Sequence, residues 1–407
     1  MSIDRVLVTA TLDQLTSPGT GSRGGYRNHS HDHIPGSVLR GACAAAWIRR
    51  HGLPTGQDSA FADIFEGEGT FGPLHAASTV RVPLSVRVHK YGPGPDCQQL
   101  WWDQARGDNA TRCPDCEQEL IESKGETLKP PARVTRTHAA LTPDGVAIDD
   151  KLFQTTALAS GTQLSGWVTG SAVAALYHQG RPIPRLKLGG NRSTGGAAAI
   201  TLDPHAAPEP LETCDDALIL RMAAPAVFFD DRGFPADRPS PHQLRAALGC
   251  GADISAAWTR WTSVGGWHAA SGLPKPVERA VAAGSTYLVH PHHTPDPDAL
   301  DRLRTAGIGA RRREGFGALY TTPEPPRPLA YWVRRARPVT TIPGWARLSA
   351  HLRARAQRWP PDTATDARLL AAVTKTTAPD QATALTELFT HTDHALYRAI
   401  LDRIETQ

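Results

Sequence analysis

The chain has 407 residues, with 44 Lys plus Arg against 40 Asp plus Glu, and it holds 36 Gly and 34 Pro. This length predicts two or three domains with sizeable cores. Hydrophobic residues at 40% and charged residues at 21% exclude a wholly disordered or collagen-like chain. No apolar run is long enough to span a membrane, and the N-terminal stretch lacks a signal-peptide pattern, so we expect a soluble, cytoplasmic protein.

Positive charge is concentrated in one part of the chain. Between Arg302 and Arg358 there are 13 Arg, no Lys and two acids, which gives this stretch a charge of +11. A GC-rich genome would explain why Arg exceeds Lys overall, but it would not explain the clustering. Arg suits bidentate contacts to phosphate and stacking on bases. The cluster therefore predicts a surface that faces nucleic acid, with docking of a neighbouring subunit as the alternative.

Residues 3–12 alternate as in a strand, and a loop rich in Gly, Ser and His leads to a helix for which Ser37 is the candidate N-cap. A polar, turn-rich insertion covers about residues 89–131. Strands are expected at 132–140 and 161–169 and a helix at 171–179. A Gly-rich loop at 186–197 and a strand at 198–202 close this half.

A Pro-rich joint at 204–210 separates the halves, and the second half repeats the same plan. Strands are expected at 217–223 and 285–290, and a helix at 297–306 precedes a Gly- and Arg-rich loop at 307–317 and a closing strand. The shared order of helix, loop and strand indicates a weak internal repeat. Beyond residue 328 the pattern predicts helices at 344–358, 364–375 and 381–405.

The two Gly-rich loops lie at matching places, each before a strand. Glycine lets a backbone approach a phosphate chain closely, and neighbouring Arg supplies charge. Neither loop has the Gly-Lys-Ser or Gly-Lys-Thr of a nucleoside-triphosphate loop. An ordinary turn is the alternative for either loop taken alone.

Several of these motifs together resemble the RAMP superfamily of CRISPR effector proteins. The residues that carry the resemblance are Ile34-Pro35-Gly36-Ser37, Leu39-Arg40-Gly41 and Gly307-Ile308-Gly309 with Arg313-Glu314-Gly315-Phe316-Gly317. Two such domains over residues 1–322 further resemble the subunit of type III complexes, especially type III-D, that holds the 5′ handle of the CRISPR RNA.

The resemblance implies an α+β fold of tandem ferredoxin-like (RRM-like) domains. The first would span residues 1–205 with a zinc-binding insertion at about 89–131, and the second residues 215–322. The resemblance implies nothing specific about residues 323–407, which the helical pattern and the Arg cluster predict to be a basic helical extension. The resemblance also implies a non-catalytic subunit in antiviral defence that caps the backbone filament. Its partners would be the CRISPR RNA, a neighbouring RAMP backbone subunit and the large signalling or nuclease subunit. By matching position, the RNA contacts would be Ser37, Arg40, Gly189, Gly190, Arg192, Gly195, Gly309, Arg311, Arg312, Arg313, Gly315 and Phe316, although Phe316 could equally be a core residue.

Four residues of the insertion have the spacing of a metal site: His89, Cys97, Cys113 and Cys116. Two Cys three positions apart present both sulfurs to one ion, and a distant pair completes a tetrahedron. The prediction is one structural zinc ion. Relatives usually carry Cys at the first position, so His138 competes with His89 as the fourth ligand. The alternatives are reduced surface thiols or a redox pair.

His29, His31 and His33 surround Asp32 and could form an acid–base set, since imidazoles act as both base and acid near neutral pH. This would make the chain a metal-independent RAMP endoribonuclease that processes precursor CRISPR RNA. Solvated or phosphate-contacting His in a loop is the other interpretation. A third possibility is a zinc-stabilised scaffold that contacts only protein.

Overall fold

The computed structural model describes residues 3–20, 27–56, 58–94, 97–190, 193–268, 272–321, 329–360, 362–391 and 394–405. The chain divides into two compact units. The first contains residues 1–86, 104–107 and 122–323, and the second contains 87–103, 108–121 and 324–407. Within the described ranges, no helix is both long and apolar enough to cross a membrane.

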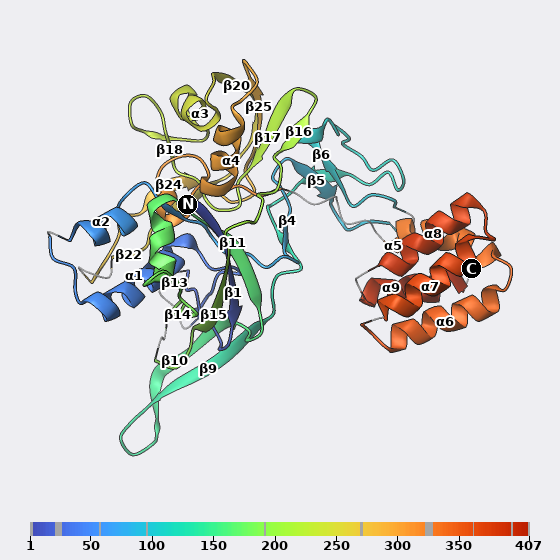
Figure 1. The fold of residues 1–407 in the computed structure, drawn as a ribbon, viewed down its shortest axis with the longest axis horizontal. Helices are drawn as coiled ribbons and strands as arrows, with labels where there is room; N and C mark the ends of the chain where they lie inside the picture. The colour runs from blue at the N-terminus through green and yellow to red at the C-terminus, as the bar shows by residue number, and fades with distance from the viewer. Residues whose placement is uncertain are drawn as a thin grey trace. The chain divides into compact units, whose positions relative to one another are not determined.

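The first half of the first unit is built on a five-stranded antiparallel sheet (Figure 1). Its strands lie in the order β14 (Arg185–Lys187), β15 (Ala197–Asp203), β1 (Arg5–Leu12), β11 (Gln163–Thr169) and β3 (Thr70–Phe71). Alternate residues of β1 are buried, from Val6 to Leu12, as the period-two pattern predicts. The strands predicted at 3–12, 161–169 and 198–202 are therefore confirmed.

Helix α1 (Gly36–His51) packs its apolar side into the core of this sheet. Leu39, Cys43 and Trp47 are buried in the same cluster as β1. The prediction of Ser37 as N-cap is wrong. Pro35 occupies that position with φ −58° and ψ 146°, an extended geometry that its ring favours, so Ser37 lies in the first turn.

The helix predicted at 171–179 is a 3₁₀ helix, η2 (Gly170–Leu176), followed by a small hairpin of β12 (Tyr177–His178) and β13 (Arg181–Pro182). The turn between these strands has positive φ at Gln179 and Gly180, which ends any helix there. A short helix that the sequence analysis did not anticipate, α2 (Ser59–Phe65), is capped by the Asp58 carboxylate.

A long hairpin of β9 (Arg133–Leu141) and β10 (Ala147–Leu158) extends from this half (Figure 1), and β2 (Arg27–Asn28) pairs with β10. Val134, Leu152 and Phe153 are exposed on it. The strand predicted at 132–140 is confirmed, whereas the sequence analysis did not predict its partner.

The second half carries a four-stranded antiparallel sheet in the order β16 (Glu212–Cys214), β17 (Ala217–Arg221), β25 (Thr286–Pro291) and β20 (Ala252–Trp258). Helices α3 (Pro241–Leu248) and α4 (Pro297–Ala306) contribute to its core, and α4 has the predicted bounds. The predicted closing strand is reduced to a bridge between Met222 and Leu319.

Four short two-stranded ladders complete the first unit. They pair β4 (Val80–Arg81) with β8 (Thr127–Leu128), β18 (Phe228–Phe229) with β19 (Pro235–Ala236), β21 (Trp261–Val264) with β24 (Glu278–Val281), and β22 (Trp267–His268) with β23 (Leu273–Pro274). The 3₁₀ turn η3 (Arg312–Glu314) lies in the second Gly-rich loop, and η1 (Gln104–Arg106) follows strand β6 (Trp101–Asp103) of the insertion.

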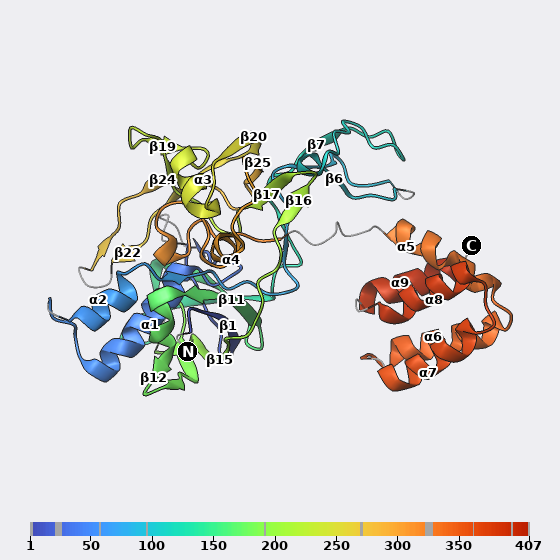
Figure 2. The same cartoon turned by 45° about the horizontal axis from the view of Figure 1, so that its top comes forward.

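In the second unit, the insertion forms a three-stranded sheet in the order β6 (Trp101–Asp103), β5 (Val86–His89) and β7 (Leu120–Glu122), part of which Figure 2 shows. The C-terminal part is helical: α5 (Leu329–Ala336), η4 (Arg337–Thr341), α6 (Trp345–Gln357), α7 (Thr363–Thr374), α8 (Pro379–Thr390) and α9 (His394–Glu405). The helices predicted at 344–358 and 364–375 are confirmed. The single helix predicted at 381–405 is wrong, because α8 ends at Thr390 and the backbone of His391 is extended.

Candidate functional sites

Two motifs from opposite ends of the first unit meet at the start of α1. A Cβ on Gly36 would lie 2.7 Å from both the Glu314 carbonyl oxygen and Gly315 Cα, and it would overlap the Phe71 carbonyl oxygen. Gly315 itself has φ +85°, a conformation that favours glycine. The helix that begins at Gly36 is thus seated on the second Gly-rich loop through a contact that only glycine permits.

Beside this contact, Glu66 joins two of the predicted RNA-binding Arg. Arg40 donates to the Phe65 carbonyl oxygen (3.0 and 2.8 Å) and is ion-paired with Glu66. Arg313 Nη1 donates to the Glu66 carbonyl oxygen (2.7 Å) and to its Oε2 (2.9 Å). The Glu66 side chain is 56% exposed, so water screens both pairs. The sequence analysis did not single out Glu66.

The Arg311 side chain is engaged by neighbouring side chains of the protein. Its guanidinium donates to Glu314 (3.1 and 2.9 Å) and Glu278 (3.0 Å), and it lies over the Phe316 ring, 4.6 Å from the centroid. Burial opposes its charge, yet the bonds to the two carboxylates raise its pKa. Arg311 and Phe316 are therefore placed as supports of the loop conformation.

These side chains line a cavity of about 300 Å³ together with Lys275, whose Nζ lies 2.8 Å from Glu314 Oε2. Its lining residues are Arg40, Glu66, Lys275, Arg311, Arg313 and Glu314, and we call this set the basic cleft. Four cations face two carboxylates there, so the cleft carries excess positive charge. Ser37 is exposed in the first turn of α1, and Arg312 lies half-buried in the loop.

The first Gly-rich loop packs against a different segment. A Cβ on Gly189 would lie 2.6 Å from the Ser17 carbonyl oxygen, and the Gly190 N–H donates to that oxygen (2.9 Å). Gly309, in the second loop, is similarly close to the Val227 carbonyl oxygen. Gly195 is half-buried. Arg192 lies outside the described residues.

The histidines at 31 and 33 join a cluster with His75 and Arg81. The His33 ring lies 5.1 Å from that of His31 and stacks on His75 at 4.7 Å, and its Nδ1–H donates to Asp32 (2.8 Å). Burial and the charge of His33 lower the pKa of His31 to about 4, so its imidazole is neutral at pH 7. Burial alone would raise the pKa of Asp32, but His33 and Arg81 hold it well below its usual range. His29 is exposed.

In the insertion, the ligand atoms of His89, Cys97, Cys113 and Cys116 all lie within 4.8 Å of one another. Cys97 Sγ is 3.8 Å from Cys113 Sγ and 3.4 Å from His89 Nε2. A tetrahedral ion about 2.3 Å from each thiolate would separate two sulfurs by about 3.8 Å, so the donor set fits a metal ion.

His138 is not part of this group. It lies exposed on β9, where its ring stacks on Phe153 at 4.9 Å. The choice between His89 and His138 is thus decided for His89. Sequence spacing could not decide it, because His138 follows the last Cys closely enough to reach a site on a folded loop.

Three solved structures illustrate what the chain resembles. The type III-B Cmr-beta complex bound to cognate target RNA and AMPPnP contains a chain with 13% identity, and the match covers 70% of this chain and 86% of that chain with a TM-score of 0.39. A CRISPR-associated protein Cas6 has 9% identity, and the match covers 79% of this chain and 99% of that chain with a TM-score of 0.31. Oligomeric Cmr4 from Pyrococcus furiosus has 12% identity, and the match covers 50% of this chain and 99% of that chain with a TM-score of 0.24.

Comparison with curated proteins gives no match. The sequence comparison with protein families is more informative: residues 110–324 match the model of the CRISPR-associated protein Cas_Cmr3 family. Because that model covers more than half of the 407 residues, the chain belongs to the Cas_Cmr3 family and is a RAMP-type CRISPR protein of type III.

Proposed function

We propose that this protein is a non-catalytic RNA-binding subunit that holds the 5′ handle of the CRISPR RNA, caps the filament of backbone subunits and contacts the large subunit. Assignment to subtype III-D stays a prediction. The observation that supports RNA binding is the basic cleft, because it gathers Arg40, Lys275 and Arg313 beside the start of α1. Single-stranded RNA recognition needs a positive groove that follows the backbone.

Within the cleft, Glu66 orients two guanidinium groups before RNA arrives. Since Glu66 is more than half exposed, its ion pairs are weak, and a phosphate can replace it as the acceptor of the same donors. Arg312 and Arg313 are the Arg of the loop best suited to touch phosphate, because Arg311 is already engaged by Glu314 and Glu278.

The test is binding of the full chain to labelled RNA that carries the repeat-derived 5′ handle, at several salt concentrations. We expect the double variant Arg312→Ala/Arg313→Ala to bind at least about tenfold more weakly, with a salt slope shallower by roughly 0.7 for each lost phosphate contact. Arg232→Ala, in the exposed turn between β18 and β19, is the matched control.

Unchanged binding by the folded double variant would count against the proposal. Specific cleavage of repeat RNA that disappears when His29, His31 or His33 is replaced by Ala would instead favour the endoribonuclease. Absence of any RNA from the native complex would favour the protein-only scaffold.

We also infer that the metal of the insertion is one structural zinc ion, supported by the three thiolates and one imidazole at tetrahedral spacing. Metal analysis of the purified protein should find about one zinc per chain. Cys113→Ser should lose most of it, whereas Cys214→Ser, on β16, should retain it. A folded wild-type protein without metal would contradict the inference.

The strand orders support a ferredoxin-like ancestry for both halves of residues 1–322. The ferredoxin-like fold has four strands in the spatial order four, one, three, two. The first half has this order, with β15 as strand four, followed by β1, β11 and β3. In the second half, β17, β25 and β20 stand as one, three and two. We propose domains at 1–205 and 215–322, followed by a helical extension at 323–407.

A further inference from the structure

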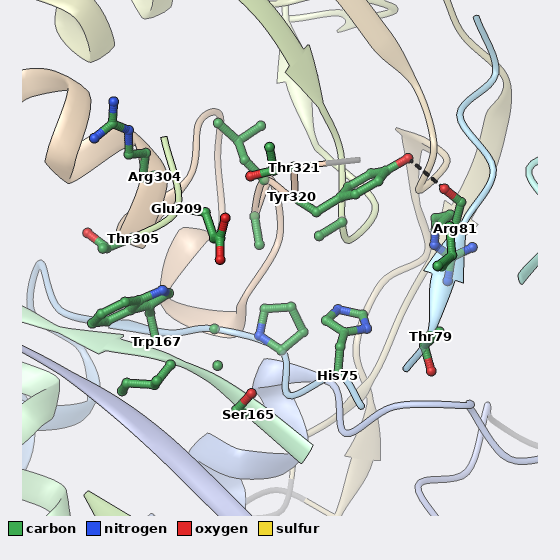
Figure 3. A pocket seen from close by; sticks show the side chains of 18 of the residues that line it. His75, Thr79, Arg81, Ser165, Trp167, Glu209, Arg304, Thr305, Tyr320 and Thr321 are labelled. Carbon is green, nitrogen blue, oxygen red and sulfur yellow. Dashed lines mark hydrogen bonds between the residues drawn. The ribbon is translucent and has the colours of Figure 1, made fainter. Parts of the chain in front are cut away.

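A second cavity, of about 360 Å³, lies between the two halves of the first unit. Its size is in the range of sites that hold a small molecule. Figure 3 shows Ser165, Trp167 and His75 on one side of it and Glu209 and Tyr320 on the other. None of these residues lines the basic cleft, and the proposed function makes no use of them.

Two buried polar atoms at this cavity have no hydrogen-bond partner in the part of the chain that is described. They are His75 Nε2 and Arg304 Nε; the Arg304 guanidinium is also ion-paired with Asp301 through Nη1 (3.0 Å), which leaves Nε as an unpaired donor. Buried polar groups in native proteins are almost always paired, and an unpaired one requires an explanation such as a bound molecule. Arg304 Nε can only donate, and His75 Nε2 donates in one of its two tautomers, so together they favour a ligand that offers acceptor atoms.

Glu209 offers hydrogen-bond acceptors to the same cavity. Its carboxylate is exposed on the Pro-rich joint, and Figure 3 shows it pointing into the cavity between Trp167 and Tyr320. Among the described residues, none forms a hydrogen bond or ion pair with this carboxylate. Because a carboxylate only accepts hydrogen bonds, it calls for a ligand with N–H donors.

One class of molecule combines these features. A nucleotide has a planar ring that stacks on tryptophan, N–H donors on its base edge, and phosphate oxygens that accept hydrogen bonds from Arg and His. Burial lowers the pKa of His75 well below its ordinary value, so its ring is neutral and Nε2 can donate or accept according to tautomer.

We propose that this cavity binds a single unstacked nucleotide, with the base against Trp167, its edge on the Glu209 carboxylate and its phosphate toward Arg304. Guanine fits best, since its Watson–Crick edge places two N–H donors side by side. Uracil fits worst, because carbonyl oxygens flank its one donor and face the carboxylate. The nucleotide can be free or part of an RNA strand.

The test is calorimetric titration of the full chain with each of the four nucleoside 5′-monophosphates. We expect saturable binding with GMP tightest and UMP weakest. Glu209→Gln should weaken GMP binding about tenfold or more, because it removes a charged acceptor. Arg304→Gln should weaken binding of all four by a similar factor. The matched controls are Asp231→Asn, on an exposed turn, and Arg302→Gln, on the same helix as Arg304.

The source of the nucleotide follows from repeating the titration with handle RNA already bound. If the RNA blocks GMP, the site takes a nucleotide of the RNA strand; if both bind together, it takes a free nucleotide. No saturable binding of any monophosphate at millimolar concentration, or equal binding by Glu209→Gln, would overturn the proposal. The first titration contains no RNA, so its failure is distinguishable from failure of the proposed function.

Discussion

At the scale of single residues, the glycine contact between α1 and the second Gly-rich loop has the least tolerance for change. Gly36→Ala would place a methyl group against the backbone at Phe71, Glu314 and Gly315, none of which can rotate away. We expect a loss of about 2–3 kcal/mol in the free energy of unfolding, measured by chemical denaturation. Gly56→Ala is the control, since no atom lies within 4 Å of its added Cβ. Equal stability of the two variants would contradict this packing.

The buried histidine cluster predicts acid sensitivity. The pKa of His31 is about 4 in the folded protein against an ordinary 6.5, so between these values the unfolded chain binds more protons. Stability therefore falls as the pH falls from 6.5 toward 4. His31→Gln should reduce that loss by about 1–3 kcal/mol, measured as unfolding free energy against pH. His205→Gln, on an exposed side chain, should leave the profile unchanged.

At the scale of elements, α6 is tied to its neighbours by a buried ion pair. Arg355 Nε lies 2.6 Å from Asp366 Oδ2, and Nη2 donates to the Phe389 carbonyl oxygen (2.7 Å). Asp366→Asn would leave the buried guanidinium without a counter-charge. We expect a loss of about 3 kcal/mol or more, seen as a lower Tm of the helical part. Asp380→Asn, exposed at the start of α8, should change stability by about 0.5 kcal/mol or less.

Helices and strands with a clear hydrophobic period were predictable from the sequence. Strands that depend on hydrogen bonds to a distant partner strand were not. The alternation of β1 and the capping and length of α4 are local properties, so their bounds agree with expectation to within about two residues. The hairpin strand β10 and the strand β20 at the edge of the four-stranded sheet have no such local signal. Their existence depends on a neighbour that supplies backbone hydrogen bonds.

At the scale of the whole molecule, the net charge of +4 is a poor guide to where a polyanion would bind. The basic cleft draws Arg40, Lys275 and Arg313 from distant parts of the chain, and Glu66 partly neutralises Arg40 and Arg313. Glu66→Gln should therefore tighten handle-RNA binding by roughly threefold to tenfold at low salt, measured by fluorescence anisotropy. Asp231→Asn is the control for the same change in charge. Weaker binding in Glu66→Gln would show instead that its orienting contacts outweigh its charge.

The sequence by itself determined the motifs, the period of the main strands, and the spacing of one His and three Cys. These depend on residues near one another in the chain, where side-chain type and backbone preference act directly. Only the tertiary structure decided that Gly36 touches Gly315, that Glu66 joins Arg40 to Arg313, and that His89 rather than His138 completes the metal group. The physical reason is that an ion pair, a close backbone contact or a set of metal ligands depends on which distant segments of the chain come together. Local residue patterns do not specify which segments these are.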